Sequence, residues 1–322
     1  MKILVTGGAG YIGSHTAKAL AKAEYEPVVL DNLSMGHAEN VRWGRLIQAD
    51  LADAGEIRKI FQTHKIEAVI HFAGSAFVGE SMQIPRRYLG NNTVNTFHLL
   101  DAMLDHGVRR FVFSSTCATY GIPEHRRIAE EHPQRPVNPY GESKLMVERM
   151  LHWLGEREGL RWIALRYFNA AGADPDGDLG EKHDPEPHLI PRVLLAALDR
   201  GPAVEVYGTD YETPDGTAIR DYIHVTDLAD AHVLSLRRLL NDGASGPINL
   251  GTGCGSSVRE VISMAERISG RKVPVLEGPR RAGDPPVLVA DASLANRLLG
   301  WNPRFSDLAT IVETAWKWHS TT

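Results

Sequence analysis

Tyr140 and Lys144 stand four residues apart in the stretch 138–144, which reads Asn-Pro-Tyr-Gly-Glu-Ser-Lys. Asn138 can cap a helix and Pro139 suits its first turn, so the spacing predicts both side chains on one helix face. A nearby ammonium group favours the phenolate and lowers the pKa of a tyrosine. The pair is therefore predicted to accept a proton from a substrate hydroxyl. A solvated helix face often shows the same spacing, so the prediction depends on its surroundings.

A glycine-rich loop follows the first apolar segment of the chain. Residues 2–6 form an apolar run of strand length, Gly7, Gly10 and Gly13 come next, and residues 14–23 show a helical pattern. Strand, glycine loop and helix together are typical of dinucleotide binding, because the glycines allow close backbone approach to a pyrophosphate. The N–H groups at the helix N-terminus favour the phosphates. The alternative is an ordinary tight turn between a strand and a helix.

Asp31 ends the second predicted strand, which spans residues 27–31. A carboxylate at this position can accept both ribose hydroxyls of an adenosine and would repel a 2′-phosphate. The residues that follow, Asn32, Leu33 and Ser34, include no arginine. The sequence therefore favours NAD over NADP, although an aspartate at a strand end is often only a turn former.

Composition and charge exclude several classes of protein. The chain has 322 residues, 43% of them hydrophobic and 23% charged, and its net charge of −5 argues against a general binder of nucleic acid or of anionic membranes. Cys117 and Cys254 belong to no disulfide framework or metal-spaced cluster, so we expect no metal site and a cytoplasmic location. We expect neither a signal peptide nor a membrane span.

Strands and helices alternate through the first half of the chain, which predicts an α/β fold with a Rossmann-type, doubly wound parallel sheet. Ligands bind beyond the carboxyl ends of the strands in such sheets. Asp50, residues 71–74 and residues 114–116 are expected at these ends. The predicted strands are 2–6, 27–31, 45–48, 68–72, 110–114 and 161–166, and the predicted helices are 12–22, 53–63, 91–106 and 138–157.

The character of the chain changes after residue 169. Residues 172–187 are rich in Gly, Pro and Asp and indicate a loop, beyond which no clear strand–helix rhythm continues. We expect an NAD-binding domain over residues 1–169 and a smaller, mixed α/β substrate-binding domain over residues 170–322. A helix at 226–240 and a strand at 247–250 predict a return to the sheet near residues 226–251.

Further motifs extend along the whole chain. The distinctive stretches are residues 7–15, 31–34, 71–74, 78–81, 114–116, 138–144, 165–169, 215–217 and 220–225. With these motifs the chain resembles the extended short-chain dehydrogenase/reductase family and, within it, the UDP-sugar 4-epimerases. The resemblance implies reversible interconversion of UDP-glucose and UDP-galactose by hydride transfer to and from tightly bound NAD, through a 4-keto sugar.

The resemblance also implies roles for individual residues. Tyr140 is similar to the base that takes the proton of the sugar 4-hydroxyl, Lys144 to the residue that binds the nicotinamide ribose, and Thr116 to the hydroxyl that bonds the same sugar oxygen. Implied cofactor contacts are Gly7, Gly10, Tyr11, Ile12, Gly13, Asp31, Asn32, Ser34, Asp50, Leu51, Phe72, Ala73, Asn91, Ser114, Tyr140, Lys144, Tyr167 and Phe168. Implied substrate contacts are Thr116, Asn169, His188, Leu189, Tyr207, Arg220, Tyr222, Arg281, Asp284 and Leu288.

Some positions depart from the family pattern or allow another interpretation. Ser75-Ala76 stands where many members carry a lysine, and His188 stands where some carry asparagine. Arg220 followed by Asp221 allows a plain structural ion pair. By resemblance Leu288 borders the sugar C2 substituent, where its intermediate size implies weak activity on N-acetyl sugars. The alternative is a strand residue that simply packs.

Other functions within and outside this family remain alternatives. A 4,6-dehydratase is disfavoured because Cys117-Ala118 follows Thr116 in place of an Asp-Glu pair. An epimerase of UDP-N-acetylglucosamine, UDP-glucuronate or a UDP-pentose stays open, as does a non-catalytic NAD-binding sensor. The expected partner is a UDP-sugar, with no nucleic acid and no membrane. The resemblance also implies a homodimer through helices near 91–106 and 138–157.

Overall fold

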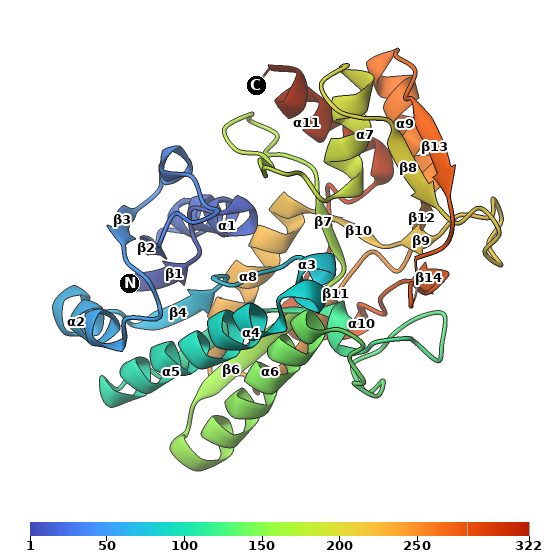
Figure 1. The fold of residues 1–322 in the computed structure, drawn as a ribbon. Coiled ribbons are helices and arrows are strands. Elements are labelled where there is room, and N and C mark those ends of the chain that lie inside the picture. The colour runs from blue at the N-terminus through green and yellow to red at the C-terminus, as the bar shows by residue number, and fades with distance from the viewer. Residues whose placement is uncertain (282, 322) are drawn as a thin grey trace.

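A seven-stranded parallel sheet forms the centre of the computed structural model, which describes residues 1–281 and 283–321 (Figure 1). The strand order is β11-β6-β5-β4-β1-β2-β3. The doubly wound α/β fold is therefore confirmed. The strands are β1 (Lys2–Thr6), β2 (Glu26–Asp31), β3 (Arg45–Gln48), β4 (Ala68–His71), β5 (Arg110–Thr116), β6 (Arg161–Tyr167) and β11 (Gly246–Leu250).

Helices cover both faces of this sheet because its strands are apolar on both sides. Leu4, Val69 and Phe111 face one hydrophobic cluster, which the helices α2 (Ala54–His64), α5 (Asn95–Asp105) and α6 (Pro139–Glu158) complete. Ile3 and Val5 face the other cluster, which includes residues of α1 (Tyr11–Lys22) and α8 (Val225–Leu240). The later region of the chain lies beyond the carboxyl ends of the strands (Figure 1).

The helix that carries Tyr140 begins as its sequence predicts. Asn138 accepts a hydrogen bond from the Gly141 amide at 2.8 Å, and Pro139 occupies the first turn of α6. Gly159, in the left-handed region, ends the helix. The predicted helix at 91–106 is wrong in one respect, because residues 89–94 form a π-helical segment before α5.

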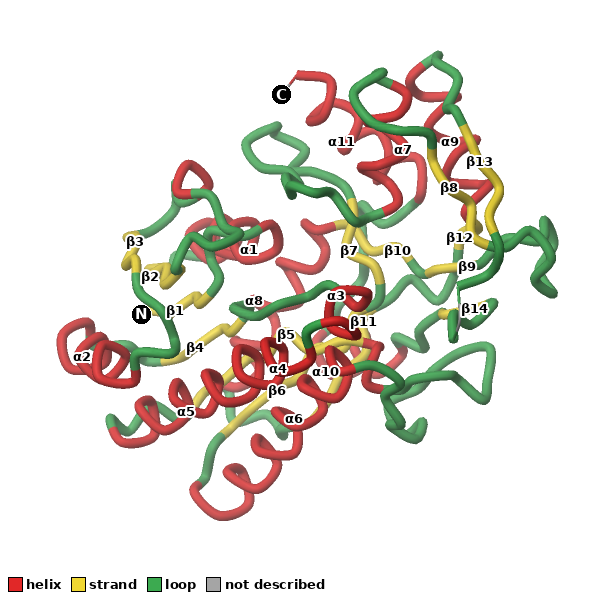
Figure 2. Tube along the Cα trace, viewed as in Figure 1, coloured by secondary structure: helices red, strands yellow, loops and turns green. Residues whose placement is uncertain are grey.

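The later part of the chain forms three small sheets and a third hydrophobic cluster (Figure 2). The strands pair as β7 (Asn169–Ala171) with β10 (Tyr222–His224), β8 (Val204–Tyr207) with β13 (Val275–Gly278), and β9 (Ile219–Arg220) with both β12 (Ser256–Ser257) and β14 (Val287–Leu288). The helices are α7 (Leu189–Ala197), α9 (Val258–Ser269), α10 (Ser293–Leu299) and α11 (Leu308–Thr321). Two short helices, α3 (Val78–Gln83) and α4 (Pro85–Tyr88), precede the π-helical segment.

Helix α8 and strand β11 return to the central sheet from this later region. β11 pairs in parallel with β6 from Gly246↔Ile163 to Leu250↔Tyr167. Ala295, Leu299 and Trp301 join the same cluster as α8. Among the described residues, no helix is long and apolar enough to cross a membrane.

Candidate active site

The glycine loop after β1 is closely packed against the loop after β4. Gly7 has a φ of 70°, and a Cβ atom there would lie 2.6 Å from the Ala73 nitrogen. A Cβ at Gly13 would lie 2.3 Å from the Gly7 carbonyl oxygen. Gly10 precedes α1, and no side chain caps this helix in the described structure. The first-turn N–H groups therefore have no side-chain cap, as at helix N-termini that bind phosphates.

Asp31 lies at the carboxyl end of β2 with its side chain buried. Its carboxylate accepts hydrogen bonds from the Ala9 amide at 3.0 Å and the Leu33 amide at 2.9 Å. These bonds fix the glycine loop and the turn after β2, so Asp31 does act as a turn former. A carboxylate has about four acceptor positions, which leaves capacity for ribose hydroxyls.

The other predicted cofactor contacts divide into surface and buried positions. Asn32 donates to the Asp50 carboxylate at 2.8 Å, and Ser34 is exposed beside them. Leu51 is buried in the core, so its side chain faces the sheet rather than a ligand. The ring of Phe72 packs 4.6 Å from the ring of His232.

An asparagine that the sequence analysis did not single out orders the loop after β4. Asn92 in the π-helical segment is buried, accepts from the Ser75 amide at 2.7 Å and donates to the Ser143 hydroxyl at 3.0 Å. The predicted contact Asn91 donates to the Ser75 hydroxyl at 3.1 Å. The extra residue of the π-helical segment places neighbouring asparagines on this loop.

Lys144 is buried at the carboxyl end of β5. Its ammonium donates to the Ser114 carbonyl oxygen at 2.9 Å and lies 4.8 Å from the centre of the Phe113 ring. A Cβ added to Gly74 would lie 3.6 Å from this nitrogen, so the lysine faces the glycine side of the site. Burial lowers the pKa of Lys144 to about 8.

Tyr140 stands beside Lys144, but its pKa shifts in the direction opposite to the prediction. Burial raises the pKa of Tyr140 and Tyr167 raises it further, while a hydrogen bond with Thr116 lowers it. The Lys144 ammonium is directed at the Ser114 carbonyl, and burial outweighs the charge effect expected from the spacing. The hydroxyl of Ser114 pairs with the Tyr167 hydroxyl at 2.5 Å.

Replacing Lys144 with methionine is expected to raise the free energy of unfolding at neutral pH. Burial lowers its pKa from 10.5 to about 8, so the folded state carries a charging penalty that is complete below pH 8 and disappears between pH 8 and 10.5. At 1.36 kcal/mol per unit the gain is at most about 3 kcal/mol, less the lost hydrogen bond to Ser114. Urea unfolding at pH 7 and pH 10 measures it. The same gain at both pH values would contradict this, and Lys272→Met, at an exposed lysine, is the control.

Glu148 extends the functional face of α6 by one more turn and was not predicted. It is buried, four residues beyond Lys144, and its carboxylate pairs with the Arg166 guanidinium at 2.9 and 3.2 Å. Ser115 donates to the same carboxylate at 2.5 Å. Arg166 also donates to the Tyr120 hydroxyl at 2.9 Å. This network ties the helix of Tyr140 to β5 and β6.

Two arginines lie on the side of the later region. Arg220 on β9 forms an ion pair with Asp284 at 2.5 Å, and the Arg281 guanidinium lies 3.9 Å from the centre of the Tyr207 ring. Burial raises the pKa values of Cys117 and Tyr222, and the positive charge of Arg220 offsets part of that rise. Arg220 therefore lies near the residue that follows Thr116.

The alternative of a plain Arg220–Asp221 ion pair is wrong. Asp221 is buried and accepts hydrogen bonds from Thr252, Gly253 and Ala290 backbone amides at 2.8, 3.1 and 3.2 Å. Asp221 thereby joins three loops, while Arg220 pairs with Asp284 and donates to the Ile219 carbonyl oxygen at 2.8 Å. The carbonyl oxygen of Asp221 accepts a hydrogen bond from the Asn169 side chain at 3.2 Å.

The remaining predicted substrate contacts have different surroundings. Leu288 is paired with Arg220 in the β14–β9 register and packs against the cluster that contains Phe168. Tyr222 is buried and Leu189 packs against the third cluster, so their side chains face the core. His188 precedes α7 and is partly exposed.

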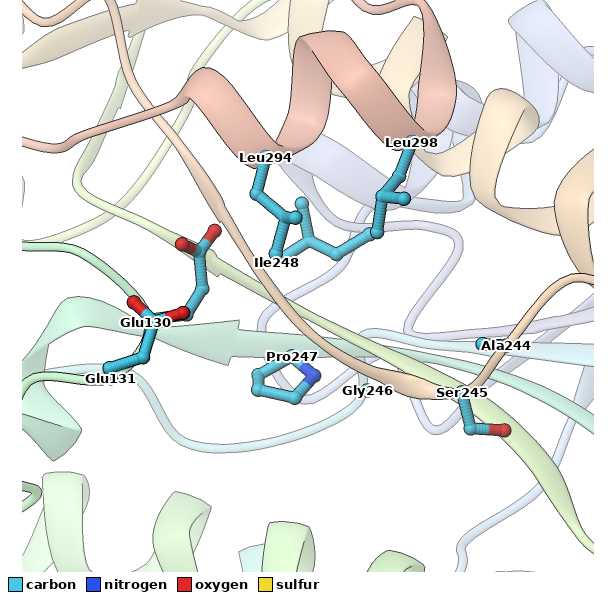
Figure 3. Close-up of a pocket in the computed structure, with 9 residues that line it drawn as sticks. All are labelled: Glu130, Glu131, Ala244, Ser245, Gly246, Pro247, Ile248, Leu294 and Leu298. Carbon is cyan, nitrogen blue, oxygen red and sulfur yellow. The ribbon is translucent and has the colours of Figure 1, made fainter.

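Two cavities of the described structure lie away from Tyr140, which lines neither of them. One, of about 310 Å³, lies at the outer edge of the sheet between β11 and α10 (Figure 3). Leu294 and Leu298 lie over Ile248 there, and the Glu130 carboxylate accepts from the Asn249 amide at 2.7 Å. The other, of about 360 Å³, includes Tyr222 and Arg304. Convergent side chains rather than cavity size therefore define the candidate site.

The loop, the tyrosine–lysine pair and the sheet order together are those of a dinucleotide-dependent enzyme of the short-chain dehydrogenase/reductase type. Residues 3–251 match the model of the NAD dependent epimerase/dehydratase family, and the chain belongs to this family. It is 51% identical over 319 residues to UDP-glucose 4-epimerase of Halalkalibacterium halodurans, covering 99% of this chain and 96% of that protein.

Solved structures agree with this family membership. The crystal structure of UDP-glucose 4-epimerase from Brucella ovis in complex with NAD has a TM-score of 0.96 and 54% identity, covering 98% of this chain and 97% of that one. The structure of the enzyme from Bifidobacterium longum in complex with NAD+ and UDP has a TM-score of 0.94 and 37% identity, covering 100% of this chain and 98% of that one.

Proposed function

We propose that this chain is an NAD-dependent UDP-glucose 4-epimerase that interconverts UDP-glucose and UDP-galactose. The observation that carries the proposal is the placement of Tyr140 and Thr116 in mutual hydrogen bonding, with Lys144 buried beside them. The glycine loop, Asp31 and Lys144 would hold NAD, because the backbone of the loop leaves no room for side chains and Asp31 retains acceptor capacity. NAD, when bound, would accept a hydride from C4 of the sugar and give it back.

The protein residues supply the proton chemistry and the orientation. Tyr140 accepts the proton of the 4-hydroxyl as the C4–H bond breaks, and returns it when the opposite epimer forms. Thr116 holds the phenol and the sugar hydroxyl in line. The raised pKa keeps Tyr140 protonated at neutral pH, so it would act as the base only when added positive charge lowers that pKa.

Two guanidinium groups would hold the diphosphate while the sugar turns its opposite face toward the cofactor. Arg220 and Arg281 present planar donors that match phosphate oxygens. Asp284 keeps Arg220 in place, and Tyr207 supports Arg281 from below its plane. With the nucleotide anchored in this way, the sugar would be free to turn and present either face of C4 to Tyr140 and the cofactor.

We also infer the domain division and a homodimer. Residues 1–169 with 226–251 would form the NAD-binding domain, and most of 170–322 the UDP-sugar-binding domain. Large apolar side chains are exposed along the outer helices, namely Val94, Phe97, Met146 and Trp153. A second copy of the chain would cover this face through α5 and α6. Sedimentation as a single 35.5-kDa species would contradict the dimer.

The free thiols of Cys117 and Cys254 support a reducing, cytoplasmic location. The function itself is tested by incubating the purified chain with UDP-galactose, with no cofactor added, and identifying the sugar nucleotides formed. UDP-glucose as the product supports the proposal. Unchanged UDP-galactose, from protein that carries NAD, would overturn it.

The nucleotide released by denaturing the purified protein is expected to be NAD, because the cycle regenerates it and Asp31 repels a 2′-phosphate. Asp31→Asn removes the negative charge and keeps one acceptor for the Ala9 or Leu33 amide. This variant is expected to retain less NAD and to discriminate less against NADP. An enzymatic assay of released NAD and NADP measures both. Recovery of mainly NADP from the wild type would contradict the role of Asp31.

Trimming Leu288 to alanine is expected to raise turnover of the N-acetyl sugars relative to UDP-glucose and UDP-galactose. Leu288 lies beside Arg220 and is half-buried, so shortening it would relieve a clash at C2 of the sugar. One or two methylenes are worth about 1–3 kcal/mol of discrimination, or roughly 10–200-fold. The measurement is kcat/KM for both sugar pairs. Val275→Ala, at an exposed apolar residue of β13, is the control, and an unchanged ratio would leave Leu288 as a packing residue.

A further inference from the structure

Four side chains from the loop before α7 meet in one small space. Glu181, His183, Glu186 and His188 each present one nitrogen or oxygen atom, and these atoms all lie within 4.8 Å of one another. The His183 Nδ1 atom lies 3.3 Å from Glu181 Oε1 and 3.6 Å from Glu186 Oε2. The His188 Nδ1 atom lies 2.6 Å from Glu181 Oε1 and 3.2 Å from Glu186 Oε1.

The His183 ring turns one nitrogen toward both carboxylates. Its Nδ1 atom is inaccessible to solvent and has no hydrogen-bond partner, although two carboxylates lie within 3.6 Å. Ligand atoms bound at about 2.0–2.1 Å in a tetrahedral zinc site lie roughly 3.3 Å apart. Three of the four distances between nitrogen and oxygen atoms are near this value, if either oxygen of Glu186 is counted. The His188–Glu181 distance of 2.6 Å is that of a hydrogen bond, so these two atoms would move apart when the ion binds.

The buried carboxylates of the cluster need a compensating positive charge. The side chains of Glu181 and Glu186 are 3% and 7% exposed, and two buried carboxylates require positive charge close by. Within residues 1–281 and 283–321, their ion pairs are with histidines alone, and no lysine or arginine reaches them. Two protonated histidines, or one divalent cation with two neutral histidines, would make the cluster neutral.

A neighbouring cluster shows how this chain balances carboxylates without a metal. Asp174, Asp176 and Asp178 also converge, but the Lys18 ammonium lies 2.6, 2.9 and 2.8 Å from their oxygen atoms. The lysine occupies the position that a cation would take. The aspartate cluster therefore has its counter-ion within the chain.

We propose that Glu181, His183, Glu186 and His188 bind one divalent transition-metal cation, for which zinc is the best match to two imidazole nitrogens and two carboxylate oxygens. The sequence analysis expected no metal, because it searched for cysteine clusters and did not recognise the Glu-x-His-x-x-Glu-x-His spacing. Four protein ligands close the coordination sphere, so the ion has a positioning role. It fixes His188 at the start of α7 and the Phe77 ring, which contacts both histidines.

The position of the ion connects two parts of the site. The charges of Glu181 and Glu186 raise the pKa of Tyr11, the first residue of α1, beyond the effect of its burial. The Tyr11 hydroxyl donates to the Gly172 carbonyl oxygen at 2.5 Å, at the beginning of the loop that carries the ligands. The ion would thus hold this loop against the start of α1.

The test is zinc stoichiometry in full-length protein purified without a histidine tag. After equilibration with Zn²⁺ and gel filtration, inductively coupled plasma mass spectrometry is expected to give about one zinc per chain for the wild type. Loss of an outer-shell partner typically weakens metal binding by roughly 10–100-fold. His183→Gln and Glu186→Gln each remove a direct ligand, so their affinity for zinc should fall by more than this. Asp176→Asn and His152→Gln are the matched controls and should bind as the wild type does.

Cobalt substitution and thermal unfolding give two further measurements, neither of which uses epimerase activity. Co²⁺ in the wild type should show the intense visible absorption of a four-coordinate site, and His183→Gln should lose it. Chelation should lower the Tm of the wild type, and added Zn²⁺ should restore it. If the variants do not fold, the chelation experiment on the wild type decides. Zinc bound equally by the wild type and His183→Gln, or a Tm that chelation leaves unchanged, would overturn the proposal in favour of an ion-pair cluster.

Discussion

Tyr140→Phe is expected to fold and retain NAD while losing about 10²–10⁴-fold in kcat, the usual contribution of a general base. The substitution removes only the phenolic hydroxyl, which pairs with Thr116 at the carboxyl end of β5. The ring itself remains to pack edge-on against Tyr88, whose ring centre lies 6.4 Å away. The measurement is steady-state conversion of UDP-galactose at pH 7, together with the NAD content of each preparation.

Tyr25→Phe is the matched control for this experiment. Tyr25 follows α1 and packs, half-buried, against the second hydrophobic cluster, away from the candidate site. Its loss of a hydroxyl should leave kcat within about twofold of the wild type, as for most surface substitutions. A near-normal kcat for Tyr140→Phe would mean that another group takes the proton.

Glu148→Gln is expected to destabilise the protein by about 3–5 kcal/mol, because it leaves the buried Arg166 guanidinium without its counter-charge. Both side chains are about 5% exposed or less, and Ser115 and Tyr120 complete the network around them. The glutamine keeps the volume of the glutamate, so no cavity forms and the loss reports on charge. Urea unfolding at pH 7 measures the change in free energy.

Glu277→Gln is the control for the buried pair. Glu277 pairs with Arg259 at 2.7 Å on the surface, where both side chains are about half exposed. Exposed ion pairs contribute roughly 0–1 kcal/mol, so this variant should change little. If the two substitutions cost the same, the Glu148–Arg166 pair does not hold α6 on the sheet.

Much of the central sheet could be predicted because strands that are buried on both faces appear in the sequence as short apolar runs. The predicted strand 110–114 became Arg110–Thr116, because backbone pairing continues through Ser115 and Thr116 opposite Arg166 and Tyr167 although the side chains turn polar. The helix of Tyr140 was predicted within one residue at each end, since Asn138 and Gly159 mark its limits locally. Local signals of this kind do not depend on tertiary contacts.

The parts that could not be predicted depend on residues far apart in the sequence. Glu148 and Arg166 are ordinary charged residues until the sheet brings β6 beneath α6. Asp221 acquires its partners near Thr252 and Ala290 only when three loops meet. The raised pKa of Tyr140 results from burial, which the spacing of Tyr140 and Lys144 does not encode.

The order of the strands in the sheet also determines when each part of the chain can fold during synthesis on the ribosome. β6 is complete at Tyr167, but its outer neighbour β11 emerges only with Gly246–Leu250, and the covering helix α8 ends shortly before. A nascent chain that stops near residue 200 therefore presents an unpaired edge at Ile163 and Leu165 and lacks one wall of its second cluster. We expect such chains to engage chaperones on the ribosome, and the first half of the protein to reach its native packing only after β11 has been made.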